Sequence, residues 1–179
     1  GDYLERAGAL IDFGVDVIVM DVAHAHSRAV IKLAIENFRK KFGNFELVCG
    51  NVATYEGAAF LQDLGVDGIK VGIGSGYGCR TRLQTSAGVP QVQAIRAAFQ
   101  GVSRNWNTDY VSDFPVISDG GVRHNAHIAL ALLLGASSVM IGGMLAGTEE
   151  TPGELINDPA DNSKYKIYRG MTSPEAKLD

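Results

Sequence analysis

The sequence predicts a parallel α/β fold, and within that class a (β/α)8 barrel. Helical segments alternate with short, nearly continuous apolar strands, which are typical of parallel sheets buried on both faces. Polar or glycine residues follow every predicted strand, at Asp21, Asn51, Gly72, Asp119 and the Gly142-Gly143 pair. This recurrence favours a barrel, because an open doubly wound sheet would gather its ligand-binding residues at one switch point.

An internal repeat supports the alternation of helices and strands. Its three copies are FGVDVIVMD at 13–21, LGVDGIKVG at 64–72 and LGASSVMIG at 134–142. In each copy a glycine stands where a helix would end, and an apolar strand follows after a short turn. We therefore expect one β/α unit to be repeated along the chain.

The individual elements follow in chain order. We expect helices over 3–13, 28–41, 55–64, 90–99 and 125–134, and strands over 15–20, 45–49, 68–71, 114–118 and 138–141. Ser27 and Thr54 are suited to cap the second and third helices. The polar segment 100–113, which contains Trp106, is predicted to be a loop. Because a closed barrel needs eight strands, the chain is expected to be part of a larger catalytic domain.

Composition excludes several classes of function. The chain has 179 residues, of which 46% are hydrophobic and 20% charged, as expected of a globular domain. A net charge of −4 without a basic block argues against nucleic acid as a partner. There is no apolar run of membrane-spanning length, and we expect no signal peptide. Two cysteines do not form a disulfide framework, so a cytoplasmic location is expected.

The glycine-rich segment KVGIGSGYGCRTR, at 70–82, is the predicted centre of the chemistry. Alternate glycines allow backbone N–H groups to approach an anion such as phosphate. Cys79 follows them between Gly78 and Arg80, and neighbouring guanidinium groups favour the nucleophilic thiolate. Cys49 lies within an apolar strand and is expected to be buried. The alternative interpretation is a surface turn that ends in a structural cysteine.

Eight motifs occur in an order that resembles one known family. They are DVAHAHS (21–27), GNVAT (50–54), KVGIG (70–74), CRTR (79–82), GVPQ (88–91), SDGG (118–121), GGMLAG (142–147) and YRGM (168–171). Together they resemble the inosine-5′-monophosphate (IMP) dehydrogenase and guanosine-5′-monophosphate (GMP) reductase family over nearly the whole chain. The resemblance implies a barrel whose third to seventh strands this chain supplies. It also implies that residues 1–179 are part of a single catalytic barrel domain, with the start of a mobile flap at about 151–179.

The resemblance also implies roles for individual residues. Cys79 would attack C2 of the purine, and Thr81 would help to activate water or to handle ammonia. The remaining implied contacts are, for the nucleotide, Asp119, Gly121, Gly142, Gly143, Tyr168, Gly170 and Met171; for the nicotinamide cofactor, Asp21, Asn51, Gly72 and Gly74; and, for a potassium ion, the backbone carbonyls of Gly74, Gly76 and Cys79. The implied partners are a purine nucleoside monophosphate, NAD (or NADPH in a reductase) and further copies of the chain in a homotetramer.

Two activities fit these motifs. The segments 51–54, 148–154 and 168–171 favour IMP dehydrogenase, which oxidises IMP to xanthosine monophosphate in guanine nucleotide synthesis. Ser118 and the Gly142-Gly143 pair favour GMP reductase, but Pro174 stands where that enzyme's glutamate is expected. We predict the dehydrogenase, with the reductase as the alternative and a non-catalytic nucleotide-binding protein as the second alternative.

Several residues depart from the family pattern or allow other interpretations. Tyr77 and Gly78 replace the usual Ser followed by Ile or Val, and Arg80 replaces a usual Thr or Ile. His24 and His26 have the alternate spacing of metal ligands, but a solvated loop or a cofactor contact is the favoured interpretation. Asp21 could also cap the helix that follows it.

Overall fold

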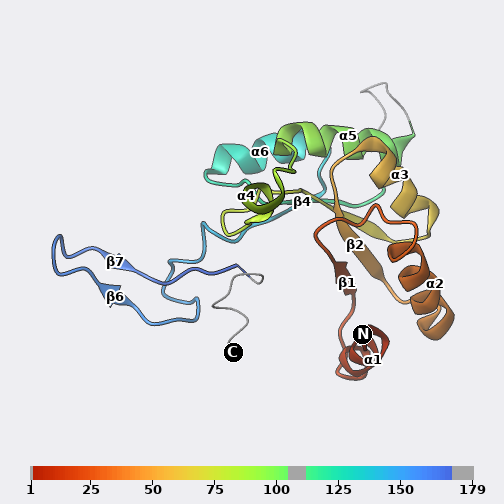
Figure 1. The fold of residues 1–179 in the computed structure, drawn as a ribbon, viewed down its shortest axis with the longest axis horizontal. Helices are drawn as coiled ribbons and strands as arrows, with labels where there is room; N and C mark the ends of the chain where they lie inside the picture. The colour runs from red at the N-terminus through yellow and green to blue at the C-terminus, as the bar shows by residue number, and fades with distance from the viewer. Residues whose placement is uncertain (1, 105–111, 171–179) are drawn as a thin grey trace.

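The computed structural model describes residues 2–104 and 112–170 and contains one five-stranded parallel sheet (Figure 1). Its strands are β1 (Ile18–Asp21), β2 (Leu47–Val52), β3 (Gly68–Val71), β4 (Val116–Asp119) and β5 (Ser138–Met140). The strands lie side by side in chain order, and every neighbouring pair is parallel. A sheet without a reversal of strand order is an arc of a barrel, because a doubly wound sheet changes direction at its switch point.

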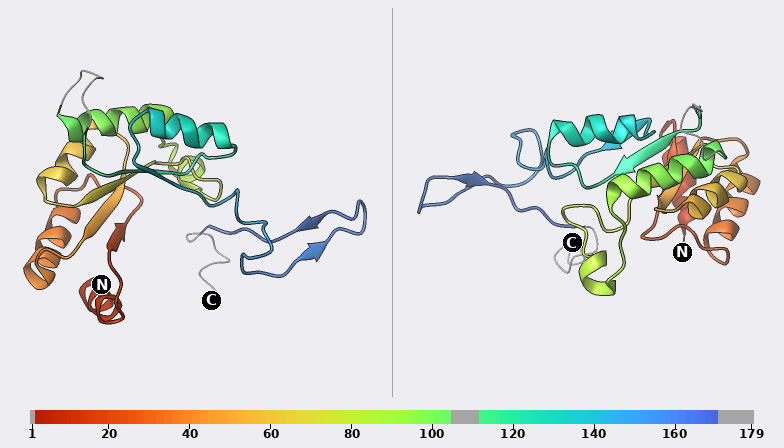
Figure 2. Two further views of the ribbon diagram at one scale, coloured as in Figure 1. Left: turned by 180° about the vertical axis from the view of Figure 1, so that it is seen from behind. Right: turned by 90° about the horizontal axis from the view of Figure 1, so that it is seen from above.

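Helices follow the outer side of this curved sheet (Figures 1 and 2). They are α1 (Tyr3–Asp12), α2 (Ile31–Phe42), α3 (Tyr55–Asp63), α5 (Gln91–Ser103) and α6 (Asn125–Leu133). The short helix α4 (Thr81–Thr85) lies in the segment between β3 and α5 and has no buried residue. The core lies between the helices and the strands. Phe38 of α2 and Leu61 of α3 are at most 1% exposed, as are Leu47, Ile69 and Val116 of the strands. Burial of these side chains fixes the helices on the sheet.

Local sequence signals account for much of this pattern. The strand Gly68–Val71 has the predicted bounds, and the Oγ1 atom of Thr54 accepts a hydrogen bond of 3.1 Å from the Gly57 N–H at the start of α3. The predicted cap at Ser27 is wrong, because α2 begins at Ile31 and Ser27 contributes only its carbonyl there. Helix α5 continues to Ser103, beyond the predicted end, and Trp106 lies outside the described residues.

A two-stranded hairpin projects away from the sheet (Figure 1). It pairs β6 (Ile156–Asn157) with β7 (Lys164–Tyr165) in antiparallel register. Just after β7, the Lys166 Nζ atom donates hydrogen bonds of 2.7 Å to the carbonyls of Thr148 and Thr151. These contacts fasten the hairpin to the segment that leads into it. A strand of two residues is too short to show the alternation of apolar and polar residues that predicts a strand, so the sequence did not predict β6 or β7.

No helix within residues 2–104 and 112–170 combines the length and the apolar character that crossing a membrane requires.

Candidate functional site

Four polar side chains from neighbouring strands meet at the carboxyl end of the sheet. The Nζ atom of Lys70 lies 3.2 Å from the Oδ2 atom of Asp21 and pairs closely with the Oδ2 atom of Asp119. The Asn51 amide donates to the same Asp119 oxygen at 2.9 Å and to the Gly72 carbonyl at 2.7 Å. We call Asp21, Asn51, Lys70 and Asp119 the Lys70 cluster.

Strand register explains why these side chains meet. Gly50 pairs with Asp21 on one side and with Lys70 on the other. A Cβ atom at Gly50 would lie 2.5 Å from the Cβ of Lys70, so glycine leaves the space that the lysine occupies. From β3, Lys70 reaches residues of β1 and β4 and lies 3.7 Å from the sulfur of Met140 in β5. Its side chain therefore spans the inner face of the sheet.

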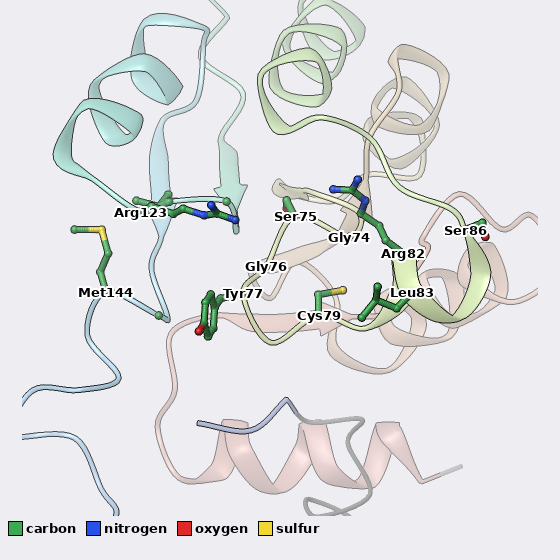
Figure 3. A pocket seen from close by; sticks show the side chains of 13 residues that line it. Gly74, Ser75, Gly76, Tyr77, Cys79, Arg82, Leu83, Ser86, Arg123 and Met144 are labelled. Carbon is green, nitrogen blue, oxygen red and sulfur yellow. The ribbon is translucent and has the colours of Figure 1, made fainter. Parts of the chain in front are cut away.

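A cavity of about 850 Å³ adjoins this cluster (Figure 3). Its walls come from three segments, each of which follows one of the strands β3, β4 and β5. The lining residues are Gly74, Ser75, Gly76, Tyr77, Cys79, Arg82, Leu83, Ser86, Gly121, Val122, Arg123, Gly143 and Met144. The structure thus brings five of the predicted site residues to one cavity: Cys79, Gly74, Gly76, Gly121 and Gly143.

Cys79 presents an exposed thiol to this cavity. Its sulfur donates to the Oγ1 atom of Thr81 at 3.3 Å. The side chain of Arg82 turns away from the sulfur toward Gly74 (Figure 3), and its Cγ atom lies where a Cβ atom on Gly74 or Gly88 would be placed. The hydrogen-bond partner of the thiol is therefore threonine, and the Arg82 guanidinium, which was expected to favour the thiolate, points away from the sulfur.

Close backbone packing joins the cavity to the Lys70 cluster. Ser75, which lines the cavity, donates to the backbone carbonyl of Asp119 at 2.9 Å. Gly72 has a φ of 148°, and a Cβ atom there would lie 2.1 Å from the same carbonyl oxygen. A side chain at this position would therefore push the glycine loop away from the end of β4.

Tyr168 and Tyr77 stand beside the Gly142-Gly143 pair. The two tyrosine rings pack with their centroids 5.8 Å apart. A Cβ atom on Gly142 would lie 2.9 Å from the Tyr168 hydroxyl, and one on Gly143 would lie 3.4 Å from the Cβ of Tyr77. The two phenol side chains therefore lie against a backbone segment of two glycines, which has no side chains. Met171 lies outside the described residues.

Gly78 explains one departure from the family pattern. A Cβ atom at this position would lie 3.0 Å from the Cε1 atom of Tyr168 and 3.5 Å from the backbone of Gly170. The branched residue usual at this place would displace the Tyr168 ring. The glycine thus permits the contact between Tyr77 and Tyr168 that this chain has.

Sequence reasoning missed two polar side chains near the site, the half-buried Gln91 and the buried Lys70. Gln91 donates to the Val71 carbonyl at 2.8 Å and to the Oγ atom of Ser118 at 3.1 Å, which ties α5 to β3 and β4. Lys70 is the first residue of the KVGIG motif, and the sequence analysis predicted no role for its side chain. Its role could have been predicted from its place as a charged residue within an apolar, buried strand, because a buried charge is almost always paired with another polar group.

The two histidines of the β1 loop pack locally. Their rings are stacked with centroids 6.4 Å apart, and the His26 ring lies 5.0 Å from that of Phe60. The His26 backbone N–H donates to the Nδ1 atom of His24 at 3.2 Å. Within the described residues, no three His, Cys, Asp or Glu side chains are grouped closely enough to hold a metal ion.

Cys49 differs from Cys79 in its access to solvent. It is fully buried in β2, and burial raises the pKa of its thiol to about 12, with a smaller contribution from the nearby charge of Asp21. A raised pKa keeps the thiol protonated throughout the neutral and mildly alkaline range. Alkylating reagents need both access and the thiolate.

We therefore expect an alkylating reagent to modify Cys79 rapidly between pH 7 and 9 while Cys49 stays unmodified. Peptide mass spectrometry would follow both sites in one sample. After unfolding in denaturant, Cys49 should react as fast as an ordinary exposed cysteine. Modification of Cys49 ahead of Cys79 in the folded protein would contradict this description of the site.

Taken together, the fold and the site define an α/β barrel segment with a cavity at the carboxyl ends of its strands, and this cavity is lined by an exposed cysteine. A family model described as "IMP dehydrogenase / GMP reductase domain" matches residues 1–179. The chain belongs to this family, which confirms both the resemblance and the barrel fold predicted from the sequence.

Curated relatives and a solved structure agree with this assignment. The chain is 43% identical to inosine-5′-monophosphate dehydrogenase of Nitrosopumilus maritimus over 99% of its own length and 35% of the relative's. It is 44% identical to the enzyme of that name from Escherichia coli, over 94% and 33% respectively. A cysteine-to-alanine variant of Trypanosoma brucei GMP reductase, in complex with GMP, matches with a TM-score of 0.88 and 38% identity, over 99% of this chain and 35% of that one. The chain thus spans about a third of the length of these proteins.

Proposed function

We propose that the protein carrying this chain is an IMP dehydrogenase that oxidises IMP to xanthosine monophosphate with NAD. The observation that carries the proposal is the Cys79 thiol, exposed in a cavity with Thr81 as its partner and with Gly121 and Gly143 in the walls. Such a cavity offers a nucleophile and a cradle for an anion together. The names of the curated relatives support this activity over others.

The nucleotide would lie across the cavity and the Lys70 cluster. The Asp119 carboxylate would accept hydrogen bonds from the ribose hydroxyls. Backbone N–H groups at Gly121, Gly142 and Gly143, together with the Tyr168 phenol, would hold the 5′-phosphate. Tyr77 would add a second phenol at this end, in place of the smaller serine hydroxyl of the family pattern. Gly170 and Met171 would border the base.

The chemistry follows from the position of Cys79. As a thiolate, its sulfur would form a bond to C2 of the purine, an electrophilic carbon between two ring nitrogens. NAD, when bound, supplies the acceptor for the hydride that leaves C2. Water would then add to C2 of the resulting thioimidate, and cleavage of the C–S bond would return the thiol and release xanthosine monophosphate. The Thr81 hydroxyl, already in contact with the sulfur, would help to activate that water.

Residues of the Lys70 cluster and the glycine loop fit the cofactors that the family implies. Asp21 is 57% exposed, so its carboxylate is available to a hydroxyl of the dinucleotide near Gly72 and Gly74. The Asn51 amide hydrogens are directed to Asp119 and Gly72, so its contribution to the dinucleotide site would be indirect. Backbone carbonyls of Gly74, Gly76 and Cys79 are the kind of ligand that potassium prefers. The Gly76 carbonyl accepts one hydrogen bond, from Cys79, and retains its second lone pair.

GMP reductase is the second candidate, because one solved structure that matches over nearly all of the chain is a GMP reductase with GMP bound. In that reaction the Cys79 thiolate would add to C2, ammonia would leave, and a hydride from NADPH would arrive at C2 before the sulfur departs. The same residues would serve both reactions. We further propose that the β6–β7 hairpin belongs to the flap, that residues 1–179 are part of a single catalytic barrel domain, and that the protein is a cytoplasmic homotetramer.

The two activities are separated by one pair of assays on the full polypeptide. We expect IMP with NAD to yield NADH absorbance at 340 nm and xanthosine monophosphate by chromatography. We expect GMP with NADPH to yield neither IMP nor ammonia above the level of a Cys79→Ser control. Turnover of the second pair alone would make the protein a reductase, and turnover of neither pair would reject both proposals.

A further inference from the structure

The Lys70 ammonium lies beneath the site rather than in it. Its side chain is only 6% exposed, whereas the side chains of Asp119 and Asp21 are 21% and 57% exposed. A ligand that enters from solvent would therefore meet the carboxylates and not the ammonium. A buried charge of this kind persists in a fold only when charged or polar partners compensate for its desolvation.

Contacts to Asp119 converge on one of its two carboxylate oxygens. The Lys70 ammonium and the Asn51 amide both donate to the Oδ2 atom. Within residues 2–104 and 112–170, no hydrogen bond is made by the Oδ1 atom. One oxygen is therefore held by the protein, and the other remains as an acceptor for a ligand. Fixing one oxygen sets the direction of the other, which preorganises the carboxylate.

The same ammonium also holds Asp21, and this gives it a second role. Asp21 and Asp119 come from β1 and β4, which are not neighbours in the sheet. Lys70 lies on β3, one of the two strands between them, and reaches both carboxylates with one nitrogen. A change in the charge or position of either carboxylate therefore changes the environment of the other.

From these contacts we infer that Lys70 is a positioning residue that orients Asp119 for the nucleotide and couples it to Asp21 on the cofactor side. The inference rests on the proposed function, which assigns the nucleotide to Asp119 and the dinucleotide to Asp21. The inference has one consequence that can be measured. Asp21 does not contact the monophosphate in that assignment, so an effect of Asp21 on monophosphate affinity must pass through Lys70.

The test measures monophosphate affinity in the full polypeptide without relying on turnover. IMP or GMP is titrated against the rate at which an alkylating reagent modifies Cys79, so protection reports binding. In the Asp21→Asn variant, the concentration of monophosphate that gives half-maximal protection of Cys79 should rise about fivefold or more. Fivefold is the lower end of the usual range for coupled sites. Neutralising Asp21 leaves the ammonium less firmly placed and the cluster less negative, and both effects make Asp119 a poorer acceptor for ribose hydroxyls.

A double-mutant cycle identifies Lys70 as the carrier of this effect. Lys70→Met keeps a side chain of similar length without the charge and should weaken protection at least as much as Asp21→Asn does. Adding Asp21→Asn to Lys70→Met should then change protection by less than twofold, because the link is already absent. Lys32→Met serves as the control, because Lys32 is exposed on α2, where it pairs with the exposed Glu36 at 3.8 Å. In this variant the monophosphate should protect Cys79 at the same concentration as in the unaltered protein.

Each failure has a separate meaning. If neither IMP nor GMP protects Cys79 in the unaltered protein, the proposed function is wrong and the coupling proposal falls with it. If the monophosphate protects but Asp21→Asn leaves its affinity unchanged, the coupling is rejected while the proposed function stands. Fully additive effects of the two substitutions would also reject it. Should Lys70→Met fail to fold, the Asp21→Asn result alone decides, because that carboxylate is largely exposed.

Discussion

Replacing Cys79 by serine is expected to abolish turnover and to leave nucleotide affinity within about twofold of its original value. The hydroxyl of serine is a far weaker nucleophile than a thiolate near neutral pH. The lost interaction belongs to bond formation and not to ground-state binding. Turnover measured with the preferred substrate pair, and affinity measured by calorimetry, would separate the two effects.

The matched control for this variant is Cys49→Ala. Cys49 is fully buried in β2, so its truncation should lower the free energy of unfolding by about 1 kcal/mol or more. The rate of the chemical step should remain close to that of the unaltered protein. A Cys79→Ser protein that still turned over at a near-normal rate would show that the thiol is not the nucleophile.

Truncation of Asp119 is expected to have the second largest effect. Asp119→Ala removes the acceptor for the ribose hydroxyls, and a hydrogen bond to a charged group contributes about 1.5–3 kcal/mol. We therefore expect the monophosphate to bind weaker by about 2 kcal/mol or more in a calorimetric titration. The substitution also leaves Lys70 with Asp21 as its remaining carboxylate partner.

Two measurements make this result interpretable. Circular dichroism and a melting curve would show whether the loss of one partner of Lys70 has unfolded the protein. Asp119→Asn, which keeps the shape of the side chain, should recover part of the lost affinity, because its amide oxygen can still accept one hydrogen bond. An unchanged affinity in both folded variants would remove Asp119 from the nucleotide site.

The sequence predicted the alternation of strands and helices well because two kinds of local signal mark where these elements begin and end. Strand β3 is an apolar run between glycines, and the run fixes both of its ends. Helix α3 begins where Thr54 caps it, since a threonine hydroxyl accepts from a backbone N–H that the helix leaves unpaired. Both signals are local, so they can be read without knowledge of the fold.

Features that depend on contacts between distant segments could not be predicted. The three partners of Lys70 come from other strands, and only the register of the sheet places them around it. Arg82 follows the reactive cysteine closely in sequence, yet its side chain packs against Gly74 and Gly88 and not against the thiol. Proximity in sequence was a poor guide there, because the direction of a side chain depends on the turn that carries it.

The departure at positions 77 and 78 shows the same limitation. From the sequence, Tyr77 stands where a serine is usual, with a larger side chain that can also donate a hydrogen bond. The structure pairs the change with Gly78, whose missing side chain leaves room for the Tyr168 ring beside Tyr77. Two substitutions that seemed separate are therefore parts of one rearrangement.

The central claim is that Cys79 forms a covalent bond to the purine, and the mass of the protein during turnover tests it most directly. The full polypeptide would be mixed with IMP and NAD, quenched in acid within the first turnovers, digested and examined by mass spectrometry. We predict a peptide containing Cys79 that carries the added mass of the oxidised nucleotide, which disappears on further hydrolysis and is absent without NAD. An adduct on Cys49, or product formation with no adduct on any peptide, would contradict the claim.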